Sequence, residues 1–334
     1  MPDRDALATA FLETTAWAGG RRAPLAGDAS NRRYERVFQR ETGKAAVLMD
    51  APPDRGEDVR PFVRIAKDLR GIGLSAPDII AENPKAGFLL LEDLGDGLFS
   101  RILNADPSQE MRLYTGATDV LIHLHQHEFP LLEPFSGTLI AEHADLVFDT
   151  YVAPVSGEVD PALRSRVRAQ LEEALHQVAH PAPVMVLRDF HADNLLWLPE
   201  RDGLARIGLL DFQDAMAGHP AFDVMSLLQD VRRDVSAATE AAMIRHYVEQ
   251  TSWNDHDFRS AYAVFGALRS IRILAVFGRL SLSYSKPHYL DYMPRTWRNL
   301  TINLEHPILA PVADTLLGIL PSPTPENLNR LKPS

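Results

Sequence analysis

The chain has 334 residues, 46% of them hydrophobic and 24% charged, a composition typical of globular proteins and a length sufficient for two lobes. Its net charge of −11 argues against nucleic acid or an anionic membrane as the main partner, because both favour basic surfaces. The absence of cysteine excludes disulfides and thiol chemistry and agrees with the cytoplasmic location that we expect.

The first third of the sequence predicts a small lobe built on strands. Helical spacing is predicted at 5–18 and 58–69, and strands at 24–38 (two strands around a turn), 45–49, 79–80 and 88–91. The turn in 24–38 carries small and polar residues, which either bring backbone N–H groups close to an anion or make an ordinary hairpin. They are Gly27, Asp28, Ala29, Ser30 and Asn31.

Helices dominate the remaining two thirds, at 111–127, 160–178 and 257–282. The most apolar stretch, Ala261 to Gly278, is interrupted by two arginines, so we expect no membrane insertion. His123, His125 and His127 are spaced by two, about 200° apart around a helix, and are predicted to be helix-end polar residues rather than metal ligands. The final P-S-P-T-P-E-N-L segment is predicted to be a loose tail.

The stretch from Leu187 to Phe212 carries the strongest chemical signal. Short strands at 183–187, 195–198 and 205–210 surround Asp189, Asn194 and Asp211. A turn at 199–203 makes the last two strands a hairpin, which returns Asp211 to the neighbourhood of Asn194. Phosphoryl transfer needs a carboxylate to accept a proton and a carboxylate plus an amide to hold Mg²⁺. We predict that Asp189 is the base and that Asn194 and Asp211 are the metal ligands.

This stretch resembles the aminoglycoside phosphotransferase and choline kinase family, whose loop H-G-D-x-H-x-x-N precedes an I-D-F/W strand. His191 matches the second histidine of that loop, whereas Leu187 and Arg188 replace its first histidine and its glycine. The resemblance implies an α+β, bilobal, protein-kinase-like fold with a small β-rich N-lobe (1–94) and a larger, mostly helical C-lobe (95–334). It also implies that ATP and Mg²⁺ are the cofactors.

The resemblance places the ATP phosphates under the turn Gly27 to Asn31 and the adenine at a hinge from Glu92 to Leu94. The strand at 45–49 lacks the lysine that normally holds the phosphates, and neither Glu57 nor Asp58 matches the helix glutamate that pairs with it. Arg33 and Arg36, with Lys44 as a weaker candidate, either replace that lysine or are solvated charges at a sheet edge.

The acceptor is expected to bind in the C-terminal part. Asp223 either braces the catalytic loop, as in the family, or is an acid at a helix start. Arg269, Arg272 and Arg279 fall within roughly 80° on one helix, and receive a carboxylate or hydroxyl-rich acceptor or form a solvated face. Tyr289, with Tyr292 and Trp297, belongs to a sugar-stacking wall or to a plain core.

Further segments extend the resemblance over most of the chain, from about Leu25 to Trp297. They include L-A-G-D-A-S-N-R-R-Y, V-L-M-D-A-P-P and G-F-L-L-L-E-D-L-G, and they resemble the bacterial N-acetylmuramate/N-acetylglucosamine anomeric kinases of cell-wall recycling. This implies phosphorylation of the C1 hydroxyl of a small amino sugar. The alternatives are another acceptor, an aminoglycoside or amino alcohol, or a non-catalytic ATP-binding module, which the missing strand lysine would suggest. The oligomeric state is left open.

Overall fold

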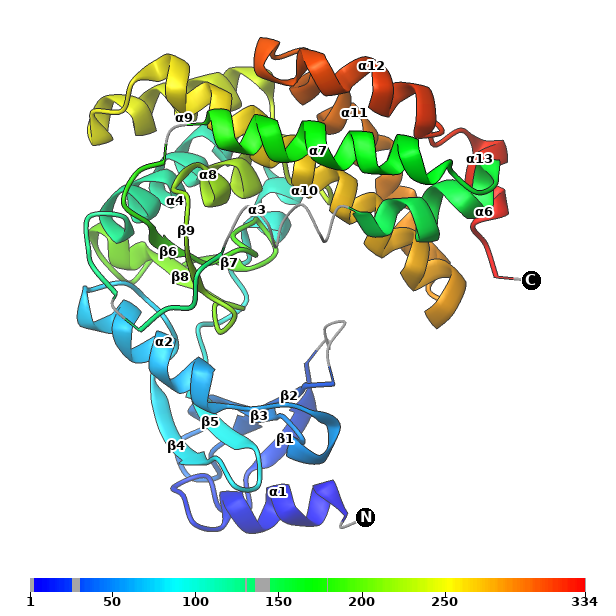
Figure 1. Cartoon of the computed structure of the whole chain (residues 1–334). Helices are drawn as coiled ribbons and strands as arrows, with labels where there is room; N and C mark the ends of the chain where they lie inside the picture. Colours follow the sequence, from blue (N-terminus) through cyan, green and yellow to red (C-terminus); the bar gives the residue numbers. More distant parts are fainter. Residues whose placement is uncertain (1–2, 26–30, 130, 136–144, 179, 334) are drawn as a thin grey trace. The chain divides into compact units, whose positions relative to one another are not determined.

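The computed structural model describes residues 3–25, 31–129, 131–135, 145–178 and 180–333. Contacts divide the chain into two units, residues 1–109 with 193–215, and residues 110–192 with 216–334. The first contains a small antiparallel sheet and the second is mostly helical, so the α+β, protein-kinase-like class is confirmed (Figure 1). The predicted lobe limits, 1–94 and 95–334, stay a prediction.

The first unit is built on five antiparallel strands in the order β1-β2-β3-β5-β4 among its described residues. The strands are β1 (Arg21–Pro24), β2 (Arg33–Phe38), β3 (Ala45–Asp50), β4 (Ile79–Asn83) and β5 (Phe88–Glu92). Its helices are α1 (Arg4–Leu12), α2 (Arg60–Gly71) and α3 (Phe99–Ala105), with short 3-10 turns at Pro53–Arg55 and Pro107–Gln109.

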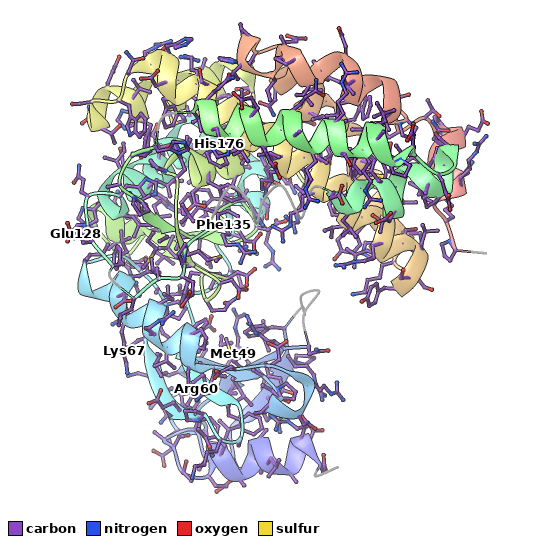
Figure 2. The ribbon with its side chains drawn as sticks, viewed as in Figure 1. Met49, Arg60, Lys67, Glu128, Phe135 and His176 are labelled. Carbon is purple, nitrogen blue, oxygen red and sulfur yellow. The ribbon has the colours of Figure 1, made fainter. Side chains whose placement is uncertain are left out.

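The two faces of this sheet are covered by different helices (Figure 1). Helix α1 buries Phe11 against Val37, Leu48 and Phe88, which alternate along their strands as a sheet face requires. Helix α2 has the apolar face predicted for 58–69, with Phe62, Ile65, Ala66 and Leu69 buried. Figure 2 marks Arg60 and Lys67 on α2 and Met49 on the neighbouring strand.

The prediction of a first helix over 5–18 was too long, because α1 ends at Leu12. The hydroxyl groups of Thr14 and Thr15 donate to the carbonyl oxygens of Phe11 and Leu12 at 2.7 and 2.8 Å. Such local side-chain bonds compete with helix continuation, so the chain turns here instead.

The hairpin that carries Asn194 and Asp211 also belongs to the first unit. Strands β7 (Leu195–Trp197) and β8 (Ile207–Leu209) pair antiparallel, as predicted, and a 3-10 turn (Gly203–Arg206) replaces the start of the expected strand 205–210. The backbone N–H of Leu209 donates to the carbonyl of Ser75 at 2.9 Å, and that of Trp197 to Gly97 at 2.7 Å. The hairpin is therefore anchored on both of its strands.

The second unit surrounds the long helix α10 (Asp255–Tyr284). Its described residues include a small sheet, in which β6 (Val184–Val186) pairs with β9 (Met216–Gly218). Its other described helices are α4 (Glu110–Leu124), a π-helical turn (Phe148–Val152), α6 (Ala153–Ser156), α7 (Pro161–Gln177), α8 (Ala221–Leu228), α9 (Ala237–Thr251), α11 (Met293–Leu304), α12 (Ala310–Ile319) and α13 (Pro325–Arg330), with 3-10 turns at Pro287–Tyr292 and Pro307–Leu309.

Helix α10 is a core helix. It is long and apolar enough to cross a membrane, but 78% of its most apolar window is buried inside the protein. Gly266 permits the close approach of α11, because a Cβ atom there would lie 2.4 Å from Nδ2 of Asn303. Asn303 in turn exchanges two hydrogen bonds with Gln229, at 3.0 and 2.8 Å. Such packing identifies the apolar stretch as the interior of the second unit.

The prediction of a loose C-terminal tail is wrong. Residues Pro325–Arg330 form α13, which Thr324 caps by accepting from the N–H of Asn327 at 3.2 Å. Leu331 is fully buried, and its carbonyl accepts from the Ser281 hydroxyl at 2.7 Å. Burial of this leucine and the cap fix a segment that composition alone described as a tail.

Candidate active site

The hairpin brings Asn194 and Asp211 together, as predicted. Leu195 pairs with Leu209 in its register, and the N–H of Leu210 donates to the carbonyl of Asn194 at 2.9 Å. The Nδ2 atom of Asn194 lies 3.4 Å from Oδ2 of Asp211. One amide and one carboxylate thus meet at the end of the hairpin, a donor set that suits Mg²⁺.

Asp211 has a strained backbone that its neighbours hold in place. Its φ angle of 57° is left-handed, which is uncommon for a residue with a side chain. Gln213 donates through Nε2 to Oδ1 of Asp211 at 2.8 Å and to Oδ2 of Asp214 at 3.1 Å. The buried ring of Phe212 packs on Phe62 of α2, with ring centroids 4.7 Å apart. These contacts fix the direction of the Asp211 carboxylate.

Asp189 follows β6 in the second unit, at the end of a tight turn. Its N–H donates to the carbonyl of Leu187 at 2.8 Å, and Arg188 between them has a φ of 70°. A three-residue turn with a left-handed centre is rare and strained. The Arg188 guanidinium lies 5.4 Å from the ring of Phe135, which Figure 2 marks. Arginine thus occupies a conformation that glycine, the family residue at this position, adopts more readily.

Asp223 braces this turn from the first turn of α8. Its carboxylate is fully buried and accepts from the N–H groups of Leu187 and Arg188, at 2.5 and 2.9 Å. Ser226, one turn along α8, donates to the carbonyl of Arg188 at 3.1 Å. The prediction that Asp223 braces the catalytic loop is confirmed.

Burial raises the pKa of Asp223 to about 7, and the nearby charge of Asp189 acts in the same direction. The two backbone N–H groups and Arg269 oppose this rise. Because carboxylates must be close to influence one another in this way, Asp189 and Asp223 share one electrostatic environment.

The predicted arginine stripe on α10 divides into two parts. Burial lowers the pKa of Arg269 and of Arg272, and the charge of Asp189 opposes the lowering at both. Arg188 adds a further like charge that acts on Arg272. Arg279, in contrast, is exposed. The charge of Asp189 therefore acts on two of the three arginines, and the third is exposed.

His191 is buried among cations. It is 3% exposed, and its Nε2 lies 3.0 Å from Nη1 of Arg232. Burial lowers the pKa of His191 well below its usual value, with Arg232 and Arg269 acting in the same direction. Because arginine only donates, Nε2 is the acceptor in this bond, and His191 is a neutral imidazole that positions Arg232.

The residues predicted to bind the nucleotide divide into described and undescribed positions. Gly27, Asp28, Ala29 and Ser30 lie outside the described residues. Asn31 donates through its N–H to Oε1 of Glu57 at 3.2 Å.

Arg33, Glu92 and Leu94 are the other residues predicted to bind the nucleotide. The Arg33 side chain is 56% exposed, with Nε 4.0 Å from Asp50. Glu92 donates its N–H to the carbonyl of Asp78 at 2.8 Å, and Leu94 lies against Gly208 of the hairpin.

Tyr289 and Tyr292 both pack against Phe277 of α10, with ring centroids 5.3 and 5.8 Å apart. Tyr289 is half-buried, so this cluster combines an apolar base with accessible ring surface. A role in stacking on a sugar stays a prediction.

The three histidines near the end of α4 do not converge on an ion. His125 is half-buried with Nδ1 2.7 Å from the Tyr247 hydroxyl, and Nδ1 of His127 lies 2.9 Å from the carbonyl of His123. Burial lowers the pKa of His125 to about 3, with His219 acting in the same direction. The three histidines lie at the end of α4, as predicted, and their hydrogen bonds are made within the protein.

Arg32 and Glu57 were missed as a pair by the sequence reasoning. Nε of Arg32 donates to Oε2 of Glu57 at 2.8 Å, and both side chains are largely buried. Period-two alternation counted back from the buried Val37 would have put Arg33 on one face of β2 and Arg32 on the other. That count was the available signal.

The chain matches the phosphotransferase enzyme family, APH, over residues 21–262. It is 36% identical to an N-acetylmuramate/N-acetylglucosamine kinase of Caulobacter vibrioides, over 92% of this chain and 94% of the relative. It is 31% identical to a protein of the same name in Pseudomonas aeruginosa, over 89% of this chain and 88% of the relative.

Solved structures share the fold at low sequence identity. A choline/ethanolamine kinase family protein from Mesorhizobium loti has a TM-score of 0.63 at 16% identity, covering 94% of this chain and 99% of its own. The ADP-bound aminoglycoside phosphotransferase APH(2'')-Ib has a TM-score of 0.58 at 11% identity, covering 84% and 94%. At these identities the likeness supports the fold alone.

Proposed function

Since the chain belongs to the phosphotransferase enzyme family, with ATP as the phosphate donor, we propose that it phosphorylates the C1 hydroxyl of N-acetylmuramate and N-acetylglucosamine. The observation that carries the proposal is the 36% identity, over 92% of the chain, to a kinase named for these two sugars. The product would be a sugar 1-phosphate of the cell-wall recycling route. We expect this reaction in the cytoplasm, where ATP is available.

Asp189 is the base in this proposal. Its carboxylate accepts the proton of the anomeric hydroxyl as the oxygen attacks the phosphoryl group. The brace from Asp223 supports the role, because a fixed turn holds the carboxylate in one direction and reduces the reorganisation needed for reaction. An anomeric hydroxyl is more acidic than an ordinary alcohol, so a carboxylate accepts its proton more readily.

Asn194 and Asp211 are the metal ligands. Mg²⁺, when bound, supplies charge neutralisation on the phosphate oxygens. Rotation of the Asn194 amide would put its oxygen where its nitrogen now lies, 3.4 Å from the Asp211 carboxylate, so that both side chains offer oxygen. The contacts of Gln213 and Phe212 support this role, because they hold the Asp211 carboxylate in one direction.

The surroundings of Asp189 favour a neutral or anionic acceptor. Arg269 and Arg272 are largely buried near this aspartate, and Arg188 acts on Arg272. Buried guanidinium groups stabilise carboxylates and phosphates through paired N–H donors, whereas a cationic acceptor would be repelled. The lactyl carboxylate of N-acetylmuramate fits such surroundings, and aminoglycosides or amino alcohols do not.

A ³¹P NMR time course with MgATP and single acceptors tests the function. N-acetylmuramate or N-acetylglucosamine should give a new phosphorus signal that is coupled to the anomeric proton, and kanamycin and choline should give none. Phosphorylation of kanamycin or choline with silence on both sugars would overturn the acceptor. Nucleotide binding by calorimetry without turnover on any acceptor would favour a non-catalytic module instead.

A further inference from the structure

The first unit needs a cation for the nucleotide phosphates, and β3 does not carry it. Its sequence, A-A-V-L-M-D, has no lysine at the position where related kinases use one. Five cationic side chains lie on β1 and β2 or next to them, and they are Arg21, Arg22, Arg32, Arg33 and Arg36. The guanidinium of Arg21 lies over the ring of Phe38, 4.1 Å from its centroid.

The register of the sheet separates these arginines by face. Glu35 pairs with Leu48 and Val37 with Ala46, and Val37, Ala46 and Leu48 all belong to the core under α1. Residues two apart share a face, so Arg33 lies on the α1 side, where its partner Asp50 also bonds Arg4. Arg32, Tyr34 and Arg36 lie on the opposite side, which α2 covers. The helix that covers this second face is also the one that Phe212, next to Asp211, contacts.

Arg36 is committed to the segment after β5. It donates to Asp93 and to both carboxylate oxygens of Asp96, at 3.1 Å for each bond. The hydrogen bond to Asp96 is the largest of the effects that raise the pKa of Arg36, which marks a stable ion-pair network. A side chain held by two carboxylates at this end of β2 is poorly placed to bind a phosphate as well.

Arg32 has the geometry of a supported phosphate ligand. Its Nε donates to Oε2 of Glu57 at 2.8 Å, and the two side chains are only 14% and 12% exposed. Glu57 precedes α2 and also accepts from the N–H of Asn31 through Oε1, so it is fixed from two directions. The bond to Glu57 is made by Nε, so this pair fixes the plane of the guanidinium group, which is the orientation that bidentate phosphate binding depends on.

Arg32 is also close to the proposed metal ligand. Burial opposes its charge, but Tyr34, Glu57 and Asp214 more than offset this, and the pKa of Arg32 is raised. Gln213 joins that same Asp214 to Asp211 by hydrogen bonds of 3.1 and 2.8 Å. Arg32 therefore lies within electrostatic reach of the carboxylate cluster that contains Asp211.

We propose that Arg32, positioned by Glu57, replaces the strand lysine and binds the nucleotide phosphates in this chain. In this chain Arg32, just before β2, and Glu57, before α2, would serve in place of the lysine and glutamate pair of related kinases. Arginine offers two parallel donors to a phosphate where lysine offers a point charge, so the substitution keeps the charge and adds a defined orientation. The inference rests on the proposed function, in that it assumes a nucleotide is bound at this unit.

Calorimetric binding of ADP in the presence of Mg²⁺ tests the proposal without requiring turnover. Arg32→Gln should weaken ADP about tenfold or more, the usual effect of losing a charge-assisted hydrogen bond, and Arg32→Lys should recover part of the loss. The matched control is Arg22→Gln, which breaks a comparable ion pair with Glu35 on the α1 face and should leave ADP affinity within about twofold.

Glu57 requires a separate readout because it acts through Arg32. Glu57→Gln should raise KM for ATP while changing kcat little. In the double variant with Arg32→Gln, the Glu57→Gln change should not weaken ADP binding further, since a positioning residue has no effect once the group it positions is lost. Without nucleotide, Arg32→Gln and Arg22→Gln should lower the midpoint temperature of thermal unfolding equally if the two ion pairs contribute similarly to folding.

Several outcomes would overturn the inference. They are unchanged ADP affinity in Arg32→Gln, a loss in Arg33→Gln instead, a loss of equal size in Arg22→Gln, or a wild-type protein that binds no nucleotide. Failure of the acceptor proposal is distinguishable, because a wild-type protein that binds MgADP but phosphorylates no amino sugar would leave the ADP measurements valid.

Discussion

The proposed base and the proposed metal ligands belong to different units, called here the base half and the metal half, and they are restrained in different ways. Each holds one non-glycine residue in the left-handed region, Arg188 at φ 70° before the proposed base and Asp211 at φ 57° among the proposed metal ligands. In the base half a single buried carboxylate, that of Asp223, accepts hydrogen bonds from the N–H groups of Leu187 and Arg188. In the metal half the restraint is spread over Gln213, the hairpin and a ring pair between Phe212 and Phe62.

This difference predicts different responses to damage. A buried charged acceptor leaves two unsatisfied donors when it is lost, which is costly, whereas each distributed contact is worth only a fraction of the restraint. The base half should therefore fail abruptly at one or two residues, and the metal half should lose function by degrees. The following predictions test this contrast, beginning with the largest effect.

Asp189→Asn should have the largest effect. Loss of the base should lower kcat by about 10²–10⁴, because the amide cannot accept the proton of the hydroxyl. MgADP affinity should be unchanged, since Asp189 is not a nucleotide ligand in the proposal. Steady-state kinetics with N-acetylmuramate and calorimetry with ADP give the two numbers. Near-normal turnover would show that Asp189 is not the base.

Asp223→Asn should have the next largest effect. An amide keeps one acceptor oxygen but turns an NH₂ group toward the N–H of Leu187 or Arg188, so one bond is lost and two donors face each other. A misplaced base typically costs up to about 10² in rate, and we expect kcat to fall by that order. Ser226→Ala, which removes only the bond to the Arg188 carbonyl, is the matched control and should change kcat by less than about tenfold. Equal losses in both variants would remove the special role of Asp223.

The pH dependence of stability should report Asp223 directly. Its pKa is about 7 in the folded protein and lower in the unfolded chain, so the folded state binds the proton more tightly. The stability that this group contributes is complete below about pH 4, falls as the pH rises toward 7, and is gone above.

Urea unfolding at several pH values gives the free energy of unfolding of wild type and of Asp223→Asn, and the difference between the two measures this contribution. The difference should decline by at most about 1.4 kcal/mol per pH unit between pH 4 and 7. His191 has a lowered pKa, so its contribution is lost as the pH falls, and it cancels in the comparison. A difference that is flat with pH would mean that Asp223 is ionised throughout.

Sequence reasoning reached the parts of the site that depend on local order. The strand, loop and hairpin from β6 to β8 follow from short apolar runs and turn residues, and the hairpin alone brings Asn194 to Asp211. These features need only neighbouring residues to be specified. The brace by Asp223 was expected from the resemblance to the family, because position alone left an acid at a helix start as an equal alternative.

The parts that were missed depend on tertiary packing. Arg32 and Arg33 are adjacent and chemically identical, and only the register of β2 against β3 decides which one faces α2. The tail 325–330 has a capping threonine followed by proline, but whether so short a helix forms is decided by the burial of Leu331. The three arginines of α10 share one stripe in the sequence, but the stripe does not predict that Arg279 alone among them is exposed.

The smallest effect should come from Phe62→Leu, which tests the distributed restraint of the metal half. The variant keeps an apolar side chain on α2 but loses the ring pair with Phe212, worth about 0.5–1.5 kcal/mol beyond its buried area. Because Phe212 is adjacent to Asp211, the Mg²⁺ concentration for half-maximal activity should rise by up to about tenfold, with kcat at saturating Mg²⁺ nearly unchanged.

Phe11→Leu is the matched control, since it removes a ring pair with Phe88 in the same unit, on the α1 face of the sheet. It should lower the free energy of unfolding by a similar amount. The Mg²⁺ dependence should stay as in wild type, because Phe11 and Phe88 belong to the core under α1, whereas Phe212 packs on α2. A Mg²⁺ response of equal size in both variants would mean that general loosening of the first unit, and not the ring beside Asp211, sets the metal affinity. A response confined to Phe62→Leu would show that the metal half is tuned by single contacts, each of modest value, in contrast to the all-or-none brace of the base.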